Sequence, residues 1–320
     1  MSTPTVRALG RFASAEAHRN GGPCLCEGLA DTPAHVLADR PDATVVRHGP
    51  VVAKAHAADT DPGELSVRAG VAAHPALAHV LLAPLTRSAV TADGRPVTFW
   101  PYGLPVDPRA PRDAPWEATA TLLAALHAVP TDVLPGPLPP MRGPLKAARA
   151  VERMRGAGEH PDARAVEAAW AALPAWARAE SPAPGRSLCH GDLHLGQLVR
   201  DPGGDGSWRL IDIDDMGEGD PAWDLARPAA WFACGLLAPD DWTRFLGAYR
   251  AAGGAAVPAE GDPWPALDVP ARALTVQTAA LAIAKSVAEH RELDADERDV
   301  IDACARIAHL PDELTPAPTK

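Results

Sequence analysis

Short apolar runs separated by turn-forming residues dominate the first hundred residues of the chain. β-branched residues cluster at 44–46 and 51–52, and further apolar stretches run over residues 80–85 and 97–102. Runs of this length bounded by Pro, Gly and Asp are typical of strands. We therefore expect a small β-rich lobe over residues 1–101.

A helix start follows the second of these runs. Asp61 has the side chain of an N-cap, Pro62 suits the first helical position, and Glu64 stands three residues after the cap. This is the spacing of a capping box, in which two side chains satisfy backbone N–H groups of the first turn. The pattern predicts a helix that ends before Pro75.

Apolar residues recur at helical spacing in the rest of the chain. The pattern predicts helices over residues 116–129, 163–173, 271–290 and 294–308. Six prolines mark residues 130–144 as a surface connection. We expect a mainly helical second lobe over residues 102–320, with a hinge at about residues 99–105.

One β pattern interrupts the helical half. Residues 198–200 and 208–214 have the composition of two strands, and the Gly-rich segment 201–206 between them favours a turn. If the strands pair, Gln197 lies beside Asp212. The hairpin thus brings together polar side chains that are distant in the sequence.

These side chains have the chemistry of a metal and proton-transfer site. Alternation along the second strand places Asp212 and Asp214 on one face. Carboxylate and carboxamide oxygens are hard ligands of the kind that Mg²⁺ prefers, so Gln197, Asp212 and, as a third contributor, Asp214 are metal candidates. Asp192, on the loop that leads into the hairpin, is expected to converge with them and to accept or orient the proton of an attacking hydroxyl.

Net charge narrows the classes of partner. The formal net charge of −11 disfavours a nucleic acid or an anionic membrane, because either would require a basic face. A negative balance suits a cationic substrate, although it is also a common way of staying soluble. The sequence does not indicate the oligomeric state.

Targeting patterns and cysteines favour a cytoplasmic protein. The amino terminus has no apolar region of the secretory kind, and no apolar run reaches membrane-spanning length. The five cysteines are dispersed and lack the spacing of a metal site. Cys24 and Cys26 are close in sequence, but two cysteines without further ligands rarely form such a site.

Three motifs occur in the order and spacing of a known family. CHGDLHLGQ at residues 189–197 is followed by IDIDD at 211–215 and by GDPAWDLA at 219–226. Together they resemble the aminoglycoside phosphotransferase and choline kinase family. The resemblance implies an α+β, two-lobed protein-kinase-like fold, ATP and Mg²⁺ as cofactors, and phosphoryl transfer to a hydroxyl group of a small molecule.

The resemblance also assigns roles by position. Asp192 resembles the catalytic base, and Asp212 the aspartate that holds Mg²⁺ against the nucleotide phosphates. Gln197 stands where the family usually has Asn, and the form HGDLHLGQ resembles the maltokinase and bacterial glucosamine-kinase branches, which shifts the expected acceptor toward a sugar. Asp224, in the third motif, is expected to accept hydrogen bonds that fix the catalytic loop.

A lysine on a strand of the small lobe is expected at the nucleotide end. Lys54 ends the run PVVAK and is one of very few lysines in the chain. Glu64 is the first candidate for its ionic partner, since it opens the following helix. The capping box explains Glu64 equally well.

Several functions stay open at this point. The acceptor is an aminoglycoside, an amino-sugar or a sugar; a dedicated sugar kinase is favoured if Trp100 and Trp223 stack on a ring, although tryptophans more often pack in the core. Acidic residues that could meet ammonium groups, although most such residues are solvated, are Asp240, Asp241, Asp268 and Glu289. A pseudokinase would bind nucleotide without turnover, and a Ser/His/Asp hydrolase lacks its GxSxG motif.

Overall fold

The computed structural model describes residues 4–19, 35–40, 42–86, 89–204 and 206–308, so that Cys24 and Cys26 lie outside the described residues. The chain divides into two compact units. The first comprises Met1–Arg112, Asp132–Pro139 and Gly196–Asp214, and the second comprises Asp113–Thr131, Pro140–Leu195 and Asp215–Lys320. The lobe limits at residues 1–101 and 102–320 stay a prediction, and the units add that the predicted hairpin packs with the first hundred residues.

A five-stranded antiparallel sheet forms the centre of the first unit, in the order β1-β2-β3-β5-β4. Its strands are β1 (His35–Asp39), β2 (Thr44–His48), β3 (Val51–Ala55), β4 (Val90–Ala92) and β5 (Arg95–Pro101). Lys54 of β3 lies opposite Val45 of β2 and Thr98 of β5. The predicted strands at residues 44–46, 51–52 and 97–102 are therefore confirmed.

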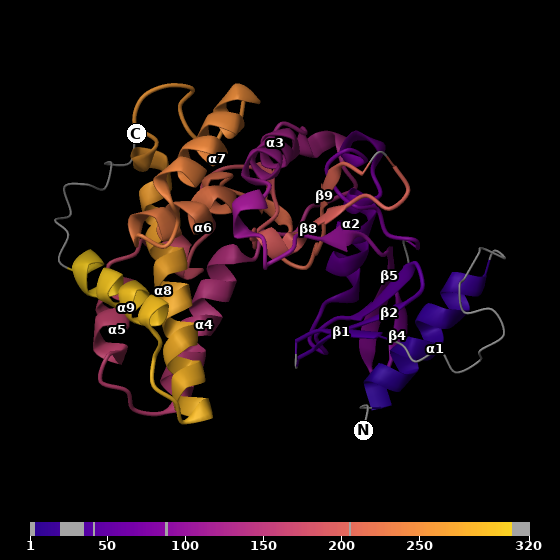
Figure 1. The fold of residues 1–320 in the computed structure, drawn as a ribbon, viewed down its shortest axis with the longest axis horizontal. Helices are drawn as coiled ribbons and strands as arrows, with labels where there is room; N and C mark the ends of the chain where they lie inside the picture. Colours follow the sequence, from indigo (N-terminus) through magenta and orange to yellow (C-terminus); the bar gives the residue numbers. More distant parts are fainter. Residues whose placement is uncertain (1–3, 20–34, 41, 87–88, 205, 309–320) are drawn as a thin grey trace. The chain divides into compact units, whose positions relative to one another are not determined.

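Helix α1 (Pro4–His18), which the sequence patterns did not predict, packs against this sheet (Figure 1). Its buried residues Val6, Leu9 and Ala13 recur at helical spacing and form one apolar face. They join a core cluster with sheet residues that include Val46 and Phe99. The sheet thus gains a covered face that keeps its strands in register.

Helix α2 (Pro62–Ala72) begins and ends as predicted. The Asp61 side chain accepts a hydrogen bond of 2.8 Å from the backbone N–H of Glu64, and the helix stops before Pro75. An unsatisfied N–H of the first turn is thereby paired, which is the physical reason that the cap pattern predicts the boundary.

The strand predicted over residues 80–85 is wrong. Within this segment only Leu81 makes a bridge, parallel to Leu210, with hydrogen bonds from Leu82 N–H to the Leu210 carbonyl and from Leu210 N–H to the Val80 carbonyl. The apolar side chains instead serve as core, since Val80, Leu81 and Leu82 are buried. Apolar runs of this length do not by themselves separate strands from buried loops.

The predicted hairpin forms the larger part of a second sheet in the first unit. Strands β6 (Leu104–Pro105), β8 (Leu198–Arg200) and β9 (Trp208–Leu210) lie in the order β6-β8-β9, and all pairs are antiparallel. The second hairpin strand is shorter than the predicted 208–214, because the backbone turns at Asp212, where φ is 66°.

The second unit is mainly helical. Its helices are α3 (Trp116–His127), α4 (Gly143–Ala157), α5 (Ala163–Ala171), α6 (Ala222–Ala233), α7 (Pro239–Ala251), α8 (Trp264–Glu289) and α9 (Ala295–Ile307). Helix α8 packs against α4, α6 and α9, and α3 packs against α7 (Figure 1). A small antiparallel sheet joins β7 (Ser187–Cys189) to β10 (Gly217–Gly219).

The four helices predicted beyond residue 102 are present, with α8 beginning at Trp264 instead of residue 271. Helices α4, α6 and α7 were not predicted. Pro144 lies in the first turn of α4, where proline is tolerated, whereas Pro228 lies inside α6, where proline is unfavourable. Packing of the buried face of α6 outweighs this local preference. In the part of the chain that the structure describes, no helix has both the length and the apolar character needed to cross a bilayer.

Candidate active site

The lysine expected at the nucleotide end lies on the central strand of the five-stranded sheet. Lys54 is 8% exposed, and its Nζ lies 2.7 Å from Oδ1 of Asp212 and 3.1 Å from Oδ2 of Asp214. Burial alone would lower the pKa of Lys54, but the two carboxylates outweigh it and raise the pKa. The ammonium group is therefore charged at neutral pH, as neutralising a phosphate requires.

Both acidic partners of Lys54 follow directly after β9. Asp212 has φ 66°, in the left-handed region that few residues other than Gly, Asn and Asp adopt. The two carboxylates thus converge on Lys54 through a turn, and not through strand alternation as the sequence suggested. Burial would raise the pKa of Asp214, but Lys54 and His56 lower it overall, so this carboxylate stays ionised.

Gln197 lies beside Asp212. Its side chain is buried, its Nε2 lies 3.4 Å from Oδ2 of Asp212, and its carbonyl accepts a 2.9 Å hydrogen bond from the N–H of Ile211. The backbone bond continues the pairing of β8 with β9 by one residue. Hairpin register therefore sets the distance between the carboxamide and the carboxylate.

The donor set of Asp212 and Gln197 fits Mg²⁺. Nε2 of Gln197 donates to Oδ2 of Asp212, and the hard donors for a metal are the carboxylate oxygens of Asp212 and the amide oxygen at the other end of the Gln197 carboxamide. Asp214 fits less well, because its Oδ2 faces Lys54 and its Oδ1 lies 2.9 Å from Nδ1 of His56. Asp212 and Gln197 could hold the ion, and Asp214 mainly anchors Lys54 and His56.

A cavity of about 400 Å³ in the first unit includes these polar groups in its lining. Lys54, Asp212 and Asp214 line it together with mostly apolar side chains such as Val52 and Trp100. Cavities of this size hold small ligands, and an apolar wall with a few charged groups is the usual arrangement. The lining suits a molecule with a flat apolar part and an anionic part.

Gly103, between β5 and β6, shapes one wall of this cavity. A Cβ at this position would lie 2.5 Å from Cγ2 of Val199 and 2.7 Å from the carbonyl oxygen of Arg200. Both residues belong to β8. Glycine therefore permits the close packing of this segment against the strand that follows Gln197.

The loop that carries Asp192 lies in the second unit, after β7. Oδ2 of Asp192 lies 2.6 Å from Nζ of Lys146, and Oδ1 lies 2.8 Å from Nη2 of Arg227. Burial would raise the pKa of Asp192, but the charges of Lys146 and Arg227 lower it overall. The carboxylate is thus ionised at neutral pH, which is the form that can accept a proton.

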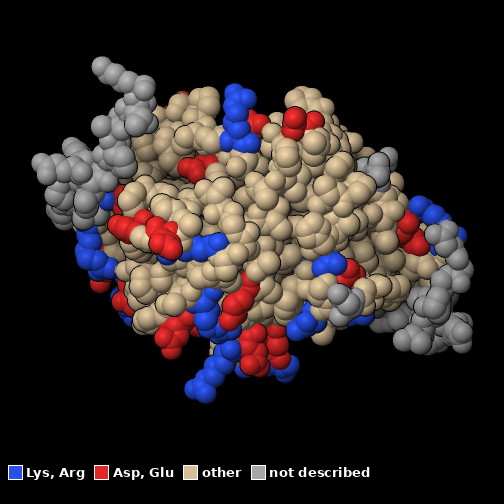
Figure 2. Space-filling view, turned by 90° about the horizontal axis from the view of Figure 1, so that it is seen from above, with Lys and Arg blue, Asp and Glu red and all other residues tan. Residues whose placement is uncertain are grey.

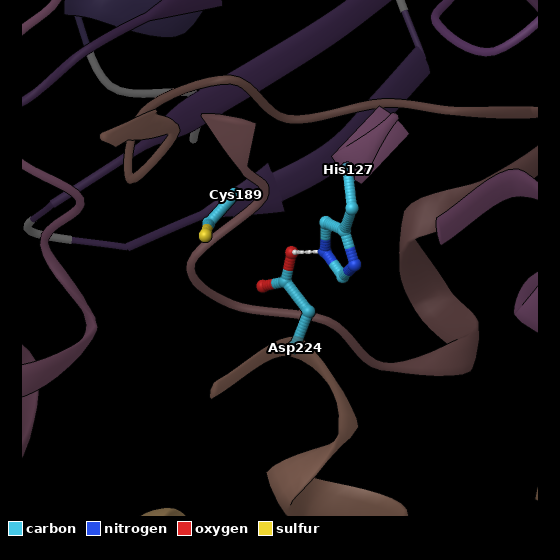
Figure 3. A group of neighbouring side chains, drawn as sticks. All are labelled: His127, Cys189 and Asp224. Atoms are coloured by element: carbon cyan, nitrogen blue, oxygen red, sulfur yellow. Dashed lines mark hydrogen bonds and ion pairs between the residues drawn. The ribbon is translucent and has the colours of Figure 1, made fainter. Parts of the chain in front are cut away.

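Asp224 holds the backbone of the loop that carries Asp192. Its Oδ2 accepts a 2.6 Å hydrogen bond from the N–H of His190, and its Oδ1 accepts a 2.8 Å bond from the N–H of Gly191. The ring of His127 adds a 3.0 Å contact from Nε2 to Oδ2 (Figure 3). The prediction that Asp224 holds the catalytic loop is confirmed.

Figure 3 shows that His127, Cys189 and Asp224 are neighbours, an arrangement that resembles a metal site. The donors are already engaged, since Asp224 accepts two backbone bonds and Nδ1 of His127 lies 2.8 Å from the Tyr249 hydroxyl. Burial, with the charge of Asp224, raises the pKa of the Cys189 thiol well above its usual value. Because these donors are already engaged in hydrogen bonds, we assign the cluster a structural role.

Glu64 does not pair with Lys54 among the contacts of the described residues. Its carboxylate accepts a 2.9 Å bond from Nη1 of Arg68, and its N–H donates to Asp61. Asp61 caps the helix through the N–H of Glu64, but the Glu64 carboxylate pairs with Arg68 and does not complete a capping box. Lys54 takes its partners from the segment after β9. Of the two tryptophans considered for stacking, Trp100 lines the cavity, whereas Trp223 is 3% exposed and packs edge-on against Trp176.

Four side chains around these groups were not predicted from the sequence: His56, Lys146, Arg227 and Arg142. The rarity of lysine could have indicated Lys146, because the chain has only Lys54, Lys146, Lys285 and Lys320. No local pattern indicates His56 or Arg227.

The candidate residues are divided between the compact units. Lys54, Gln197, Asp212 and Asp214 belong to the first unit, and their contacts lie within it, whereas Asp192 belongs to the second. The expected convergence of Asp192 with Gln197 and Asp212 stays a prediction.

Acidic and basic side chains are interspersed on the face that Figure 2 shows, and neither sign forms a separate area there. The net charge of −11 is thus not expressed on this face as a single acidic surface. Such mixing favours neither a polyanion nor a polycation as a partner of that face.

The family match shows a phosphotransferase, and the solved structures show a protein-kinase-like fold of mixed α+β architecture. The family described as the phosphotransferase enzyme family matches residues 34–264, and the chain belongs to it. The chain is thus an ATP-dependent phosphotransferase that acts on small molecules. The predicted family and fold class are confirmed.

Solved structures agree on the fold. A choline/ethanolamine kinase family protein from Mesorhizobium loti has 16% identity and a TM-score of 0.58, covering 94% of this chain and 95% of that one. A thermostable mutant of the aminoglycoside phosphotransferase APH(4)-Ia has 14% identity and a TM-score of 0.58, covering 87% and 94%. Another mutant of it, in a ternary complex with AMP-PNP and hygromycin B, has 14% identity and a TM-score of 0.58, covering 94% and 98%. No curated protein matches the chain.

Proposed function

We propose that the chain transfers the γ-phosphoryl group of ATP to a hydroxyl group of a small polar molecule, in the class of aminoglycosides, amino-sugars and sugars. The observation that carries the proposal is the buried, charged Lys54 held by Asp212 and Asp214 in the lining of a cavity of about 400 Å³. Burying a cation among carboxylates costs free energy. Binding of an anionic phosphate group together with a metal ion would explain why the protein keeps this arrangement.

The residues divide the chemistry between them. Lys54 neutralises phosphate charge, and Asp212 and Gln197 hold the metal. Bound Mg²⁺ would counter the charge on the phosphate oxygens. Asp192 orients the acceptor hydroxyl and takes its proton, for which its ionised state is suited. Catalysis would then rest on positioning and electrostatics.

A dedicated sugar kinase is the second candidate, and Gln197 favours it. Glutamine keeps the amide oxygen of asparagine but extends it by one methylene, as in the sugar-kinase branches that the motif resembles. The cavity residue Trp100 gives no further support, because Nε1 donates to Thr98 and only 8% of the residue is exposed.

ADP release with Mg-ATP over a panel of aminoglycosides, glucosamine and maltose tests the proposal. Turnover with at least one acceptor should fall by about 10²-fold or more in Asp192→Ala, the loss expected when a general base is removed. Asp302→Ala, at an exposed position of α9 (Ala295–Ile307), is the matched control and should keep full turnover. Undiminished turnover in Asp192→Ala would remove the assigned base. Absence of turnover with every acceptor would contradict the proposed function.

A further inference from the structure

Cations occupy both oxygens of Asp192. Lys146 lies 2.6 Å from Oδ2 and Arg227 lies 2.8 Å from Oδ1. Lys146 also lies 2.8 Å from Asp215, and Nε of Arg142 lies 3.7 Å from that same carboxylate. The group around Asp192 thus contains three fixed cations and two carboxylates, which gives it a positive balance in a chain whose formal net charge is −11.

These charges persist at neutral pH, and some of them are accessible. Burial would lower the pKa of Lys146, but Asp215 and Asp192 raise it overall. The side chains of Lys146 and Arg142 are 31% and 23% exposed. The surroundings of Asp192 therefore present cations to an approaching molecule.

An acceptor must bring its reacting hydroxyl to about 3 Å from a carboxylate oxygen of Asp192. An ammonium group on the neighbouring carbon would then stand a few ångströms from Lys146 or Arg227. Like charges at such distances repel strongly where water is partly excluded. Hydroxyl, carboxylate and phosphate oxygens can instead accept hydrogen bonds from the same cations.

The acidic side chains that could compensate for this repulsion are mostly paired with arginines. The pairs are Asp241 with Arg244 at 3.0 Å, Asp268 with Arg272 at 2.9 Å, and Glu289 with Arg291 at 3.1 Å. Three of the four carboxylates that the sequence suggested for ammonium recognition thus already have a cation. A polycationic acceptor would have to displace these arginines in order to use them.

We propose that the acceptor carries no ammonium group next to the hydroxyl that is phosphorylated, and that it is a neutral or anionic polyhydroxy compound. The inference rests on the proposed function through Asp192, and it narrows the acceptor class against aminoglycosides and free amino-sugars. Lys146, Arg227 and Arg142 are the residues that exclude the cation.

Matched acceptors separate charge from shape. Glucosamine, N-acetylglucosamine and glucose share a ring, but only glucosamine carries an ammonium group. Maltose, gluconate, choline and kanamycin extend the panel. We expect the highest kcat/KM for a neutral or anionic member, at least about tenfold above any ammonium compound. A cationic acceptor with the highest kcat/KM would overturn the inference while supporting the proposed function.

Variants on α4 test the cause. Arg142→Glu reverses a charge near Asp192 without touching it, and should shift the neutral-to-cationic ratio of kcat/KM by about tenfold toward the cationic member. Arg142→Gln should give a smaller shift in the same direction and covers the case in which Arg142→Glu folds poorly. Arg153→Glu makes the same charge change at an exposed position of the same helix and should leave the ratio unchanged.

Equal ratios in wild type, Arg142→Glu and Arg142→Gln would overturn the electrostatic cause. An equal shift in Arg153→Glu would also overturn it, because the effect would then come from the net charge of the protein and not from a charge near Asp192. No ADP release with any acceptor would instead contradict the proposed function, and the inference on the acceptor, which rests on that function, would then fail too.

Discussion

The hydrogen bonds that Asp224 accepts offer a sharp test of how the catalytic loop is held. Asp224 has no exposed surface, and it accepts backbone bonds from His190 and Gly191 in addition to the contact with His127. Asp224→Asn keeps the shape but replaces one acceptor oxygen by a donor. Whichever way the amide turns, at least one buried N–H loses its partner and the negative charge is gone.

The expected cost follows from these contacts. One charge-assisted hydrogen bond is lost and a buried N–H is left unsatisfied, which together amount to about 3 kcal/mol. For a chain of 320 residues, such a loss lowers Tm by roughly 4 to 5 °C. Turnover should fall as well, because the backbone just before Asp192 loses its anchor.

The pH dependence has a defined sign. Burial would raise the pKa of Asp224, but His127, His190 and the backbone N–H of Gly191 lower it overall. A lowered folded pKa means that the stabilisation is present above the unfolded pKa of about 3.9 and is lost as the pH falls through the folded value. The stabilisation that wild type gains from the ionised Asp224 over Asp224→Asn should thus be present at pH 5 and above and should shrink as the pH falls below about 4.

Urea unfolding followed by circular dichroism, together with ADP release, measures both effects. Asp240→Asn, at an exposed position of α7, is the control and should change the free energy of unfolding by less than about 0.5 kcal/mol. If Asp224→Asn unfolds within about 1 kcal/mol of wild type and keeps its kcat, the anchor role is refuted.

Three further outcomes can be checked. Gly191→Ala should lower Tm, because φ is 86° there and a Cβ would clash with the Asp215 carbonyl, with strain of about 1–3 kcal/mol; Gly247→Ala, in open space on α7, should raise Tm slightly. In a Mg²⁺ titration of turnover, Gln197→Ala should require about tenfold more Mg²⁺, and an unchanged midpoint would argue against its metal role. Because the pKa of Asp192 is lowered, its base form is lost only as the pH falls below about 4, so kcat should show no acid limb from Asp192 between about pH 5 and pH 8.

Local patterns predicted those elements whose stability is decided nearby in sequence. The cap at Asp61 and the turn-bounded strands of the first sheet are examples, since an N-cap bond or a turn type depends on a few neighbouring residues. Helix α6 was not predicted, because Pro228 lowers the helix propensity inside it and packing against α8 compensates.

Some residues of the candidate site were likewise predictable from local sequence, and some of their contacts were not. Motif order indicated Asp192, Gln197 and Asp212, because the chemistry needs those side chains at that spacing. The partner of Lys54 was not predictable from a neighbouring helix, since the turn at Asp212 brings a carboxylate from 158 residues away.

By itself the sequence determined the family, the mixed α+β class and the chemical types at the candidate site, because motifs and residue chemistry are written locally. Only the tertiary structure decided which charges meet. Lys146 and Arg227 come from two helices to the two oxygens of Asp192, and neither stands in a motif. Electrostatic interaction depends on distance in space and not along the chain, which is why the positive surroundings of Asp192 stay hidden in a sequence of net charge −11.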